Sequence, residues 1–160
     1  MKKSINKMLL MSLIGFILII VFGFLSFEYY DVFAFSKMIL DSNDPFIMTF
    51  GFVFTFFAEF VGLFLYFILV VLIPAYVLLI VFILQVISRL LHLGNEKEWK
   101  NKISKIITYI SIVLLVILGL DMISIFIITL NVLLLLSIVV IIILIICFIK
   151  ELKIIKSINS

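Results

Sequence analysis

The chain has 160 residues, of which 67% are hydrophobic and only 13% are charged, and its formal net charge is +3. Soluble domains are about 45–50% apolar and about 25% charged, so this chain has too few polar side chains to cover a soluble core. Soluble globular, disordered and collagen-like classes are therefore excluded. A single cysteine also excludes an internal disulfide framework. The composition predicts an integral membrane protein.

The first predicted element is a transmembrane helix at residues 5–28. Residues 8–27 carry no charge, and about 20 apolar residues are needed to cross a hydrocarbon core of roughly 30 Å. A cleaved signal peptide has a shorter apolar region and a cleavage site between small residues, whereas the candidate Ser26 is crowded by phenylalanines. We therefore expect this helix to be retained.

The second predicted helix covers residues 45–93. Asp44 followed by Pro45 is typical of a helix start. The segment is longer than one crossing needs, yet no turn signal lies near its middle, so we expect one long, bent helix. Its first part, residues 46–60, is rich in phenylalanine and lacks the basic residues of an amphipathic surface anchor. Residues 46–60 could lie in the interface or tilt steeply into the bilayer, and we expect burial against the other helices.

A third helix is expected at residues 96–120, after a turn at Gly94 and Asn95, because glycine is typical of helix ends and asparagine of helix starts. The tripeptide Gly119-Leu120-Asp121 resembles the turn signal at Gly94 and Asn95. The sequence therefore predicts an outer turn within residues 119–131.

The fourth helix is expected at residues 122–156. It is dominated by isoleucine, valine and leucine and offers few small residues, so we expect it to be the most peripheral helix. We interpret Cys147 as an inert buried or lipid-facing thiol. Palmitoylation is the alternative, because the apolar run ends close to Lys150.

Charge predicts the topology. All lysines and arginines except Lys37 fall at the N-terminus, within residues 89–105, or at the C-terminus. Basic loops stay in the cytoplasm, so all three clusters are expected there. The fold class is therefore an all-α integral membrane four-helix bundle with both termini cytoplasmic, and residues 1–160 form one multi-pass domain in the cell membrane. Five crossings, which would place one basic cluster outside, are the alternative.

Two carboxylates are the candidates for chemistry. Burying an unpaired ionisable group at membrane depth is costly, so such a group is a functional candidate, and Glu59 is a candidate cation or proton site. The alternative is a solvated carboxylate at the outer headgroups. Asp121 lies where the outer turn is expected and is interpreted as a helix cap. A carboxylate pair formed by Glu59 and Asp121 is the alternative for both residues.

Small residues and a proline predict how the second helix packs. Small residues spaced three or four apart form one helical face on which two helices approach closely. Beside Glu59 this face consists of Gly51, Thr55, Ala58 and Gly62. A bend is expected near Gly62 or Pro74, since proline is tolerated in a membrane helix whose neighbours satisfy the freed carbonyl.

The motifs of nucleotide-binding, zinc-protease and hydrolase sites are absent from the sequence. We expect no enzyme activity, no cofactor, no metal and no nucleic-acid partner. The predicted function is association, within the lipid bilayer, with a membrane-protein partner or with itself, in an accessory, regulatory or immunity-type role. The alternative is a cation channel, proton-coupled carrier or carrier subunit that uses Glu59, and a membrane-embedded enzyme ranks third.

Overall fold

The computed structural model describes residues 2–28, 51–91 and 98–157, and all of its regular elements there are helical. The helices are α1 (Lys2–Glu28), α3 (Phe52–Phe67), η2 (Ile68–Leu72), α4 (Ile73–Leu91), α5 (Glu98–Thr129) and α6 (Val132–Ser157). The single π-helical turn η2 joins α3 and α4 into one rod. Four helical stretches are long and apolar enough to cross a membrane, which confirms the all-helical, four-helix prediction.

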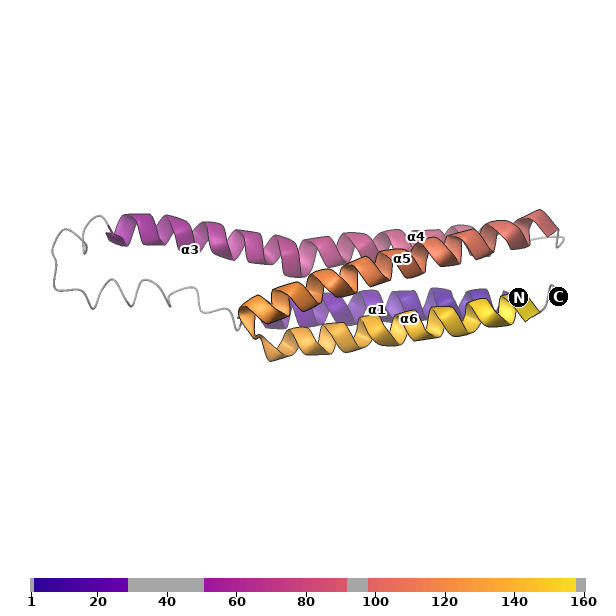
Figure 1. Ribbon diagram of the computed structural model, residues 1–160. Coiled ribbons are helices and arrows are strands. Elements are labelled where there is room, and N and C mark those ends of the chain that lie inside the picture. The colour runs from indigo at the N-terminus through magenta and orange to yellow at the C-terminus, as the bar shows by residue number, and fades with distance from the viewer. Residues whose placement is uncertain (1, 29–50, 92–97, 158–160) are drawn as a thin grey trace.

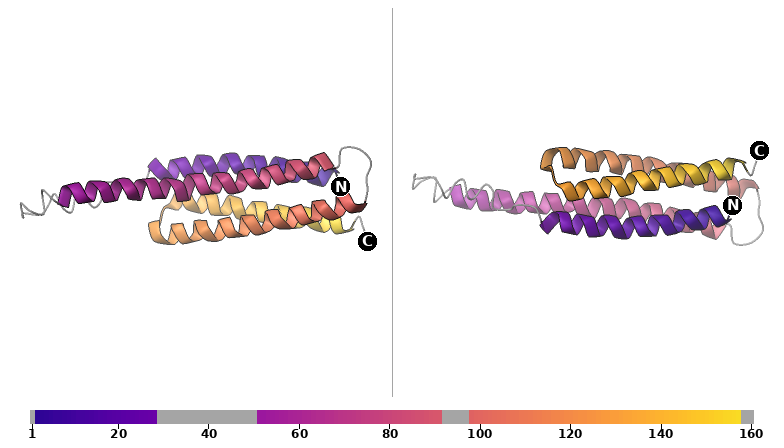
Figure 2. Two further views of the ribbon diagram at one scale, coloured as in Figure 1. Left: turned by 90° about the horizontal axis from the view of Figure 1, so that it is seen from above. Right: turned by 90° about the horizontal axis from the view of Figure 1, so that it is seen from below.

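The four rods lie side by side as a closed ring (Figures 1 and 2). The α1 helix packs against α4 and α6, and α5 packs against the same two helices, so each rod runs antiparallel to both neighbours. Both chain termini, the end of α4 and the start of α5 lie at one end of the bundle, here called the terminal end. The opposite end is called the distal end. The three basic clusters are thus gathered at the terminal end.

The core runs along the axis of the ring and takes residues from all four rods. In the middle it contains Ile19, Leu78, Leu115 and Ile141, each almost fully buried. The expectation that the fourth helix is the most peripheral is wrong. The α6 helix contacts both α1 and α5, and it buries a residue at every third or fourth position from Leu134 onward. Leucine and isoleucine form the α6 side of these contacts, and the small residues lie on the neighbouring helices. Gly15 of α1 faces Leu144, and Gly119 of α5 faces Ile141.

The second helix is long, as expected, and it changes direction where η2 meets α4 (Figure 1). Pro74 has no N–H to donate to the carbonyl of Val70, and the preceding turn widens so that the N–H of Ile73 bonds to the carbonyl of Ile68. A glycine of α1 faces this turn. A Cβ atom on Gly23 would lie 2.9 Å from the Val70 carbonyl oxygen, so only glycine permits this approach of α1.

The turn between the third and fourth helices lies later than the boundary expected at 120–122. The α5 helix continues to Thr129, and the chain reverses at Leu130 and Asn131. Leu130 has a φ of 50°, the left-handed conformation that commonly ends a helix. Asn131 Oδ1 accepts a hydrogen bond from the N–H of Leu133 at 3.0 Å and so caps α6. The turn remains inside the predicted window of 119–131.

Asp121 is therefore not a helix cap. It lies within α5, and the neighbouring glycine does not end that helix. Instead, Gly119 faces α6, where an added Cβ atom would meet the side chain of Ile141 at 3.4 Å. The two other expected signals, the helix start at Pro45 and the turn at Gly94 and Asn95, lie outside the described residues.

Candidate functional site

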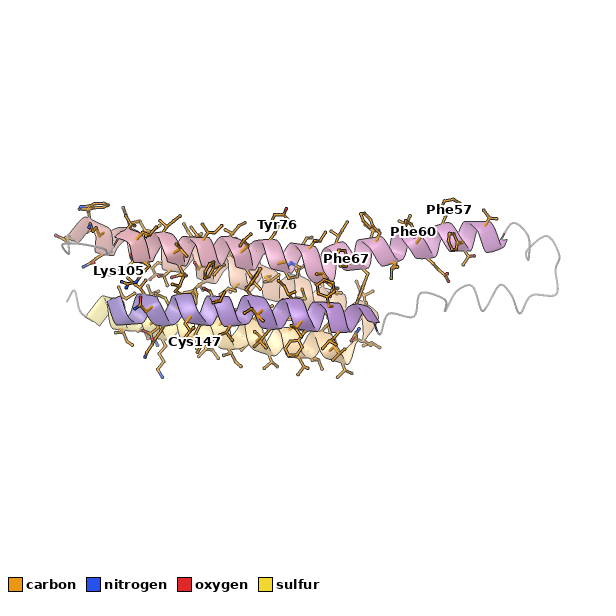
Figure 3. All side chains as sticks on the ribbon, turned by 180° about the vertical axis from the view of Figure 1, so that it is seen from behind. Phe57, Phe60, Phe67, Tyr76, Lys105 and Cys147 are labelled. Atoms are coloured by element: carbon orange, nitrogen blue, oxygen red, sulfur yellow. The ribbon has the colours of Figure 1, made fainter. Side chains whose placement is uncertain are left out.

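The α3 helix extends past the distal ends of α1, α5 and α6 (Figures 1 and 3). The stretch Thr55–Leu91 has 37 residues, which is about 55 Å of helix at 1.5 Å per residue, whereas the 27 residues of α1 span about 40 Å. The extra length is all at the distal end, because the rods are level at the terminal end. This extension places α3 largely beyond the four-helix packing.

One side of α3 is a continuous exposed apolar surface, here called the α3 face. Its members recur every three or four residues, which places them on one side of the helix. They are Val53, Phe56, Phe57, Phe60, Val61, Phe64 and Leu65. The phenylalanines are 56–63% exposed, and Phe57 and Phe60 point away from the bundle (Figure 3). The expectation that residues 46–60 are buried against the other helices is therefore wrong for Phe56, Phe57 and Phe60.

The predicted small-residue face lies on the other side of α3. Thr55 is buried and donates a hydrogen bond from its hydroxyl to the Gly51 carbonyl at 2.6 Å. Gly51 and Gly62 are half-buried, and the side chain of Ala58 lies outside the described part. The close approaches of glycines that the structure describes instead involve Gly15 and Gly23 of α1 and Gly119 of α5.

Glu59 and Asp121 lie far apart. Tyr66 and Asn131 are in hydrogen-bond contact at 3.2 Å and so mark one level of the bundle. Glu59 lies seven residues farther toward the distal end, about 10 Å, and Asp121 lies ten residues the other way, about 15 Å. About 25 Å of bundle axis therefore separates the two carboxylates, and they do not form a pair. Glu59 is half-buried on α3, and Asp121 has one buried carboxylate oxygen without a hydrogen-bond partner.

A buried hydrogen-bond cluster, here called the distal latch, joins three rods at the base of α3. The hydroxyls of Ser26 and Tyr66 are 2.6 Å apart. Asn131 Nδ2 donates to the Ser26 carbonyl at 3.1 Å and lies within hydrogen-bond distance of both hydroxyls. The distal latch fixes α3 to α1 and to the α5–α6 turn. Sequence reasoning missed it, although the isolated Asn131 in an apolar run was a signal.

A second polar cluster, the α4–α5 seam, joins those two helices nearer the terminal end. Ser88 and Ser104 are linked at 2.8 Å, and Gln85 Nε2 donates to Ser111 Oγ at 3.0 Å. Gln85 Oε1 is buried without a hydrogen-bond partner. Interhelical hydrogen bonds of this kind hold membrane helices in register. The spacing of Gln85 and Ser88, three residues apart on one face, was the available signal.

Among the residues that the structure describes, no three His, Cys, Asp or Glu side chains are grouped closely enough to hold a metal ion. The described residues present the exposed α3 face and two polar clusters, the distal latch and the α4–α5 seam. The chain matches no protein-family model, no curated protein and no solved structure.

Proposed function

We propose that the chain is a multi-pass protein of the cell membrane that crosses it four times, with both termini in the cytoplasm, and that it acts by association through the α3 face. Its partner is another membrane protein or a second copy, and its role is accessory, regulatory or immunity-type. The support for membrane insertion is the four long apolar stretches. The gathering of the basic clusters at the terminal end supports a cytoplasmic location of that end.

The main support for association through the α3 face is the length of the second rod, formed by α3, η2 and α4. Arg89 lies near the terminal end of α4, and Phe57 lies 32 residues away, about 50 Å along the helix. A bilayer is about 40–45 Å thick with its headgroups, and its hydrocarbon core is about 30 Å. A rod that starts at one interface therefore lifts the α3 face out of the opposite hydrocarbon layer. A contiguous exposed apolar patch outside the hydrocarbon layer is typical of an interaction site.

The alternative of a cation path through Glu59 has less support. Glu59 lies on the extension, next to the exposed Phe60, and about 25 Å from the carboxylate of Asp121. A conduction or proton path needs polar groups in succession across the apolar layer. The hydrogen bonds that the structure describes between hydroxyl and amide side chains of different helices instead fall in two separate clusters, the distal latch and the α4–α5 seam.

Association is tested by replacing Phe56, Phe57 and Phe60 together with alanine. The matched control replaces three isoleucines of α4 with alanine. They are Ile80, Ile83 and Ile87, which are exposed on the outer side of the four-helix bundle. The mass of the purified protein in mild detergent reports self-association, and cross-linking in native membranes reports a different partner. Loss of the complex in the phenylalanine variant, with retention in the control, is expected. Equal behaviour of the two variants contradicts the proposed role of the α3 face.

The topology is tested by labelling single cysteines. In a Cys147→Ser background, Lys3→Cys and Asn159→Cys place thiols near the two termini. A membrane-impermeant thiol reagent should label neither thiol in intact cells and both after permeabilisation. Labelling of either terminus from outside intact cells contradicts the four-crossing topology with cytoplasmic termini.

A further inference from the structure

A groove of about 420 Å³ lies between α1 and α6 at the terminal end. Its floor is apolar, with Met11 and Ile14 from α1 and Ile154 from α6. Lys7 and Lys150 line it as well, at the positions where the two apolar runs stop. The volume is within the range of small-molecule sites, about 300–1,000 Å³. The groove thus combines an apolar channel with two ammonium groups at the level expected for lipid headgroups.

Glu151 gives this groove a hydrogen-bond acceptor. It is more than nine-tenths buried, and its Oε1 lies 3.5 Å from the Lys7 ammonium. Its Oε2 is buried and has no hydrogen-bond partner. An acceptor left unpaired in a buried place costs free energy, and a ligand that brings a hydrogen-bond donor removes that cost. Lys7 itself is mostly exposed, so its ammonium keeps donors for another anion.

We infer that the groove binds one molecule of phosphatidylglycerol, an inference that rests on the proposed insertion of the chain in a membrane. The phosphodiester lies between the ammonium groups of Lys7 and Lys150. The Glu151 side chain turns so that its carboxylate accepts a hydrogen bond from a headgroup glycerol hydroxyl, and one acyl chain lies along Met11 and Ile14. Two lysines and one glutamate leave a local charge of one positive unit, which complements the single negative charge of this lipid. Methionine adapts its shape to irregular apolar ligands.

The headgroup chemistry separates this lipid from its relatives. Phosphatidylcholine has no net charge and no headgroup donor, so it satisfies neither the lysines nor Glu151. Phosphatidylmethanol keeps the anionic phosphodiester and lacks the hydroxyls, so it satisfies only the lysines. The expected order of affinity is therefore phosphatidylglycerol, then phosphatidylmethanol, then phosphatidylcholine, all with the same acyl chains.

Binding is measured by native mass spectrometry of the full chain with each of the three lipids. A basic side chain near an anionic lipid contributes about fivefold to the affinity. Lys7→Gln and Lys150→Gln should therefore each lower the affinity for phosphatidylglycerol by about fivefold. Lys153→Gln is the matched control, because Lys153 is exposed on the same helix and does not line the groove. Equal affinities of the wild type for phosphatidylglycerol and phosphatidylcholine overturn the inference. An equal effect of Lys153→Gln and Lys150→Gln also overturns it.

Glu151→Gln tests the acceptor separately. A hydrogen bond to a carboxylate is roughly twice as strong as one to a neutral amide, so the preference for phosphatidylglycerol over phosphatidylmethanol should shrink in this variant. An unchanged preference overturns the contact with Glu151. Circular dichroism checks that each variant keeps its helices.

Cys147 gives a second readout at the site itself. It is the only cysteine, it is half-buried, and it lines the groove. Alkylation of this thiol should be slower in nanodiscs that contain phosphatidylglycerol than in nanodiscs of phosphatidylcholine alone, and Lys7→Gln should reduce the difference. A rate that does not depend on the lipid overturns occupancy of the groove. Carbonate extraction distinguishes membrane insertion from lipid binding in the groove. Release of the chain from membranes contradicts the proposed insertion. Insertion without a lipid preference contradicts only the binding of phosphatidylglycerol.

Discussion

The two halves of the second rod, α3 and α4, form one continuous helix but differ in what their side chains contact. Along α4, Leu78, Val81, Gln85 and Ser88 are all buried at spacings of three or four residues. Along α3 the same spacing produces the exposed α3 face instead. Helix formation therefore depends on local sequence, whereas burial depends on whether neighbouring rods are long enough to reach. The α3 half extends beyond the neighbouring helices because α1 ends at Glu28 and the turn between α5 and α6 is at Asn131.

The two halves also differ in the chemistry of their side chains. The α4 half faces α5 with an amide and a hydroxyl that find partners on Ser111 and Ser104. The α3 half has large aromatic rings, which bury much area in an interface and lose little conformational entropy on binding. The distal latch, which includes Tyr66, lies at the boundary between the halves. We therefore expect substitutions in α4 to affect stability and substitutions in α3 to affect association.

The largest effect on stability is expected for Gly23→Leu. The new side chain starts 2.9 Å from the Val70 carbonyl oxygen, and backbone cannot move aside as a side chain can. Inserting atoms into a packed contact costs about 1–3 kcal/mol, and this site belongs at the upper limit. Thermal unfolding in detergent measures the loss. Ile142→Leu, at an exposed position of α6, is the control and should unfold like the wild type.

The next effect compares one residue from each half. Leu78→Ala, at a fully buried position of α4, should lower the free energy of unfolding by about 2 kcal/mol through the cavity that it leaves. The value is at the low limit for such changes because a helix inserted in a membrane, as proposed for this chain, gains packing rather than transfer from water. Phe57→Ala, 63% exposed on α3, should leave unfolding unchanged and weaken association. A stability loss at Phe57 as large as that at Leu78 contradicts the division between the halves.

Much of this architecture could be predicted from the sequence, because length and charge act globally. The apolar runs and the basic clusters predict four rods with both termini at one end. The turn lies inside the predicted window of 119–131, but the helix boundary expected at 120–122 is too early, because Gly119 with Asp121 two residues later resembles a helix end. Gly119 is instead a contact point with Ile141 of α6, and such a contact depends on a helix more than twenty residues away. Local signals do not contain that information.

The functional residues were harder to predict for a related reason. Glu59 stands out in a sequence because it interrupts an apolar run, yet the structure places it on the extension. The distal latch depends on Ser26, Tyr66 and Asn131, which are up to 105 residues apart. Each of them alone is an ordinary polar residue in an apolar run. Only the ring of rods brings them within hydrogen-bond distance, so no motif in the sequence marks them.

A smaller effect is expected from Asn131→Ala, at the boundary between the two halves. Asn131 bonds to both Ser26 and Tyr66 and also caps α6 through the N–H of Leu133. A helix cap contributes about 0.5–1 kcal/mol, and each of the two hydrogen bonds of this half-buried amide contributes about 0.5 kcal/mol net, so the variant should lose about 1.5–2 kcal/mol. Tyr66→Phe removes only one hydroxyl and should lose less. Thermal unfolding of both variants in detergent measures the difference, and an equal loss contradicts the capping role of Asn131.

The smallest effect is expected from Glu59→Gln. This carboxylate is half-buried on α3, outside the α4–α5 seam and about 25 Å from Asp121 along the bundle. Gln keeps its shape and removes its charge, and interactions of partly exposed charges contribute about 0–1 kcal/mol, so unfolding should change by less than about 0.5 kcal/mol. Liposomes with a cation-sensitive or pH-sensitive dye test transport, with Asp121→Asn as the control from inside the bundle. We expect the wild type and both variants to give the same trace as empty liposomes. Cation flux in the wild type that Glu59→Gln abolishes and Asp121→Asn spares would instead place Glu59 in a conduction path, and α3 would then carry transport rather than association.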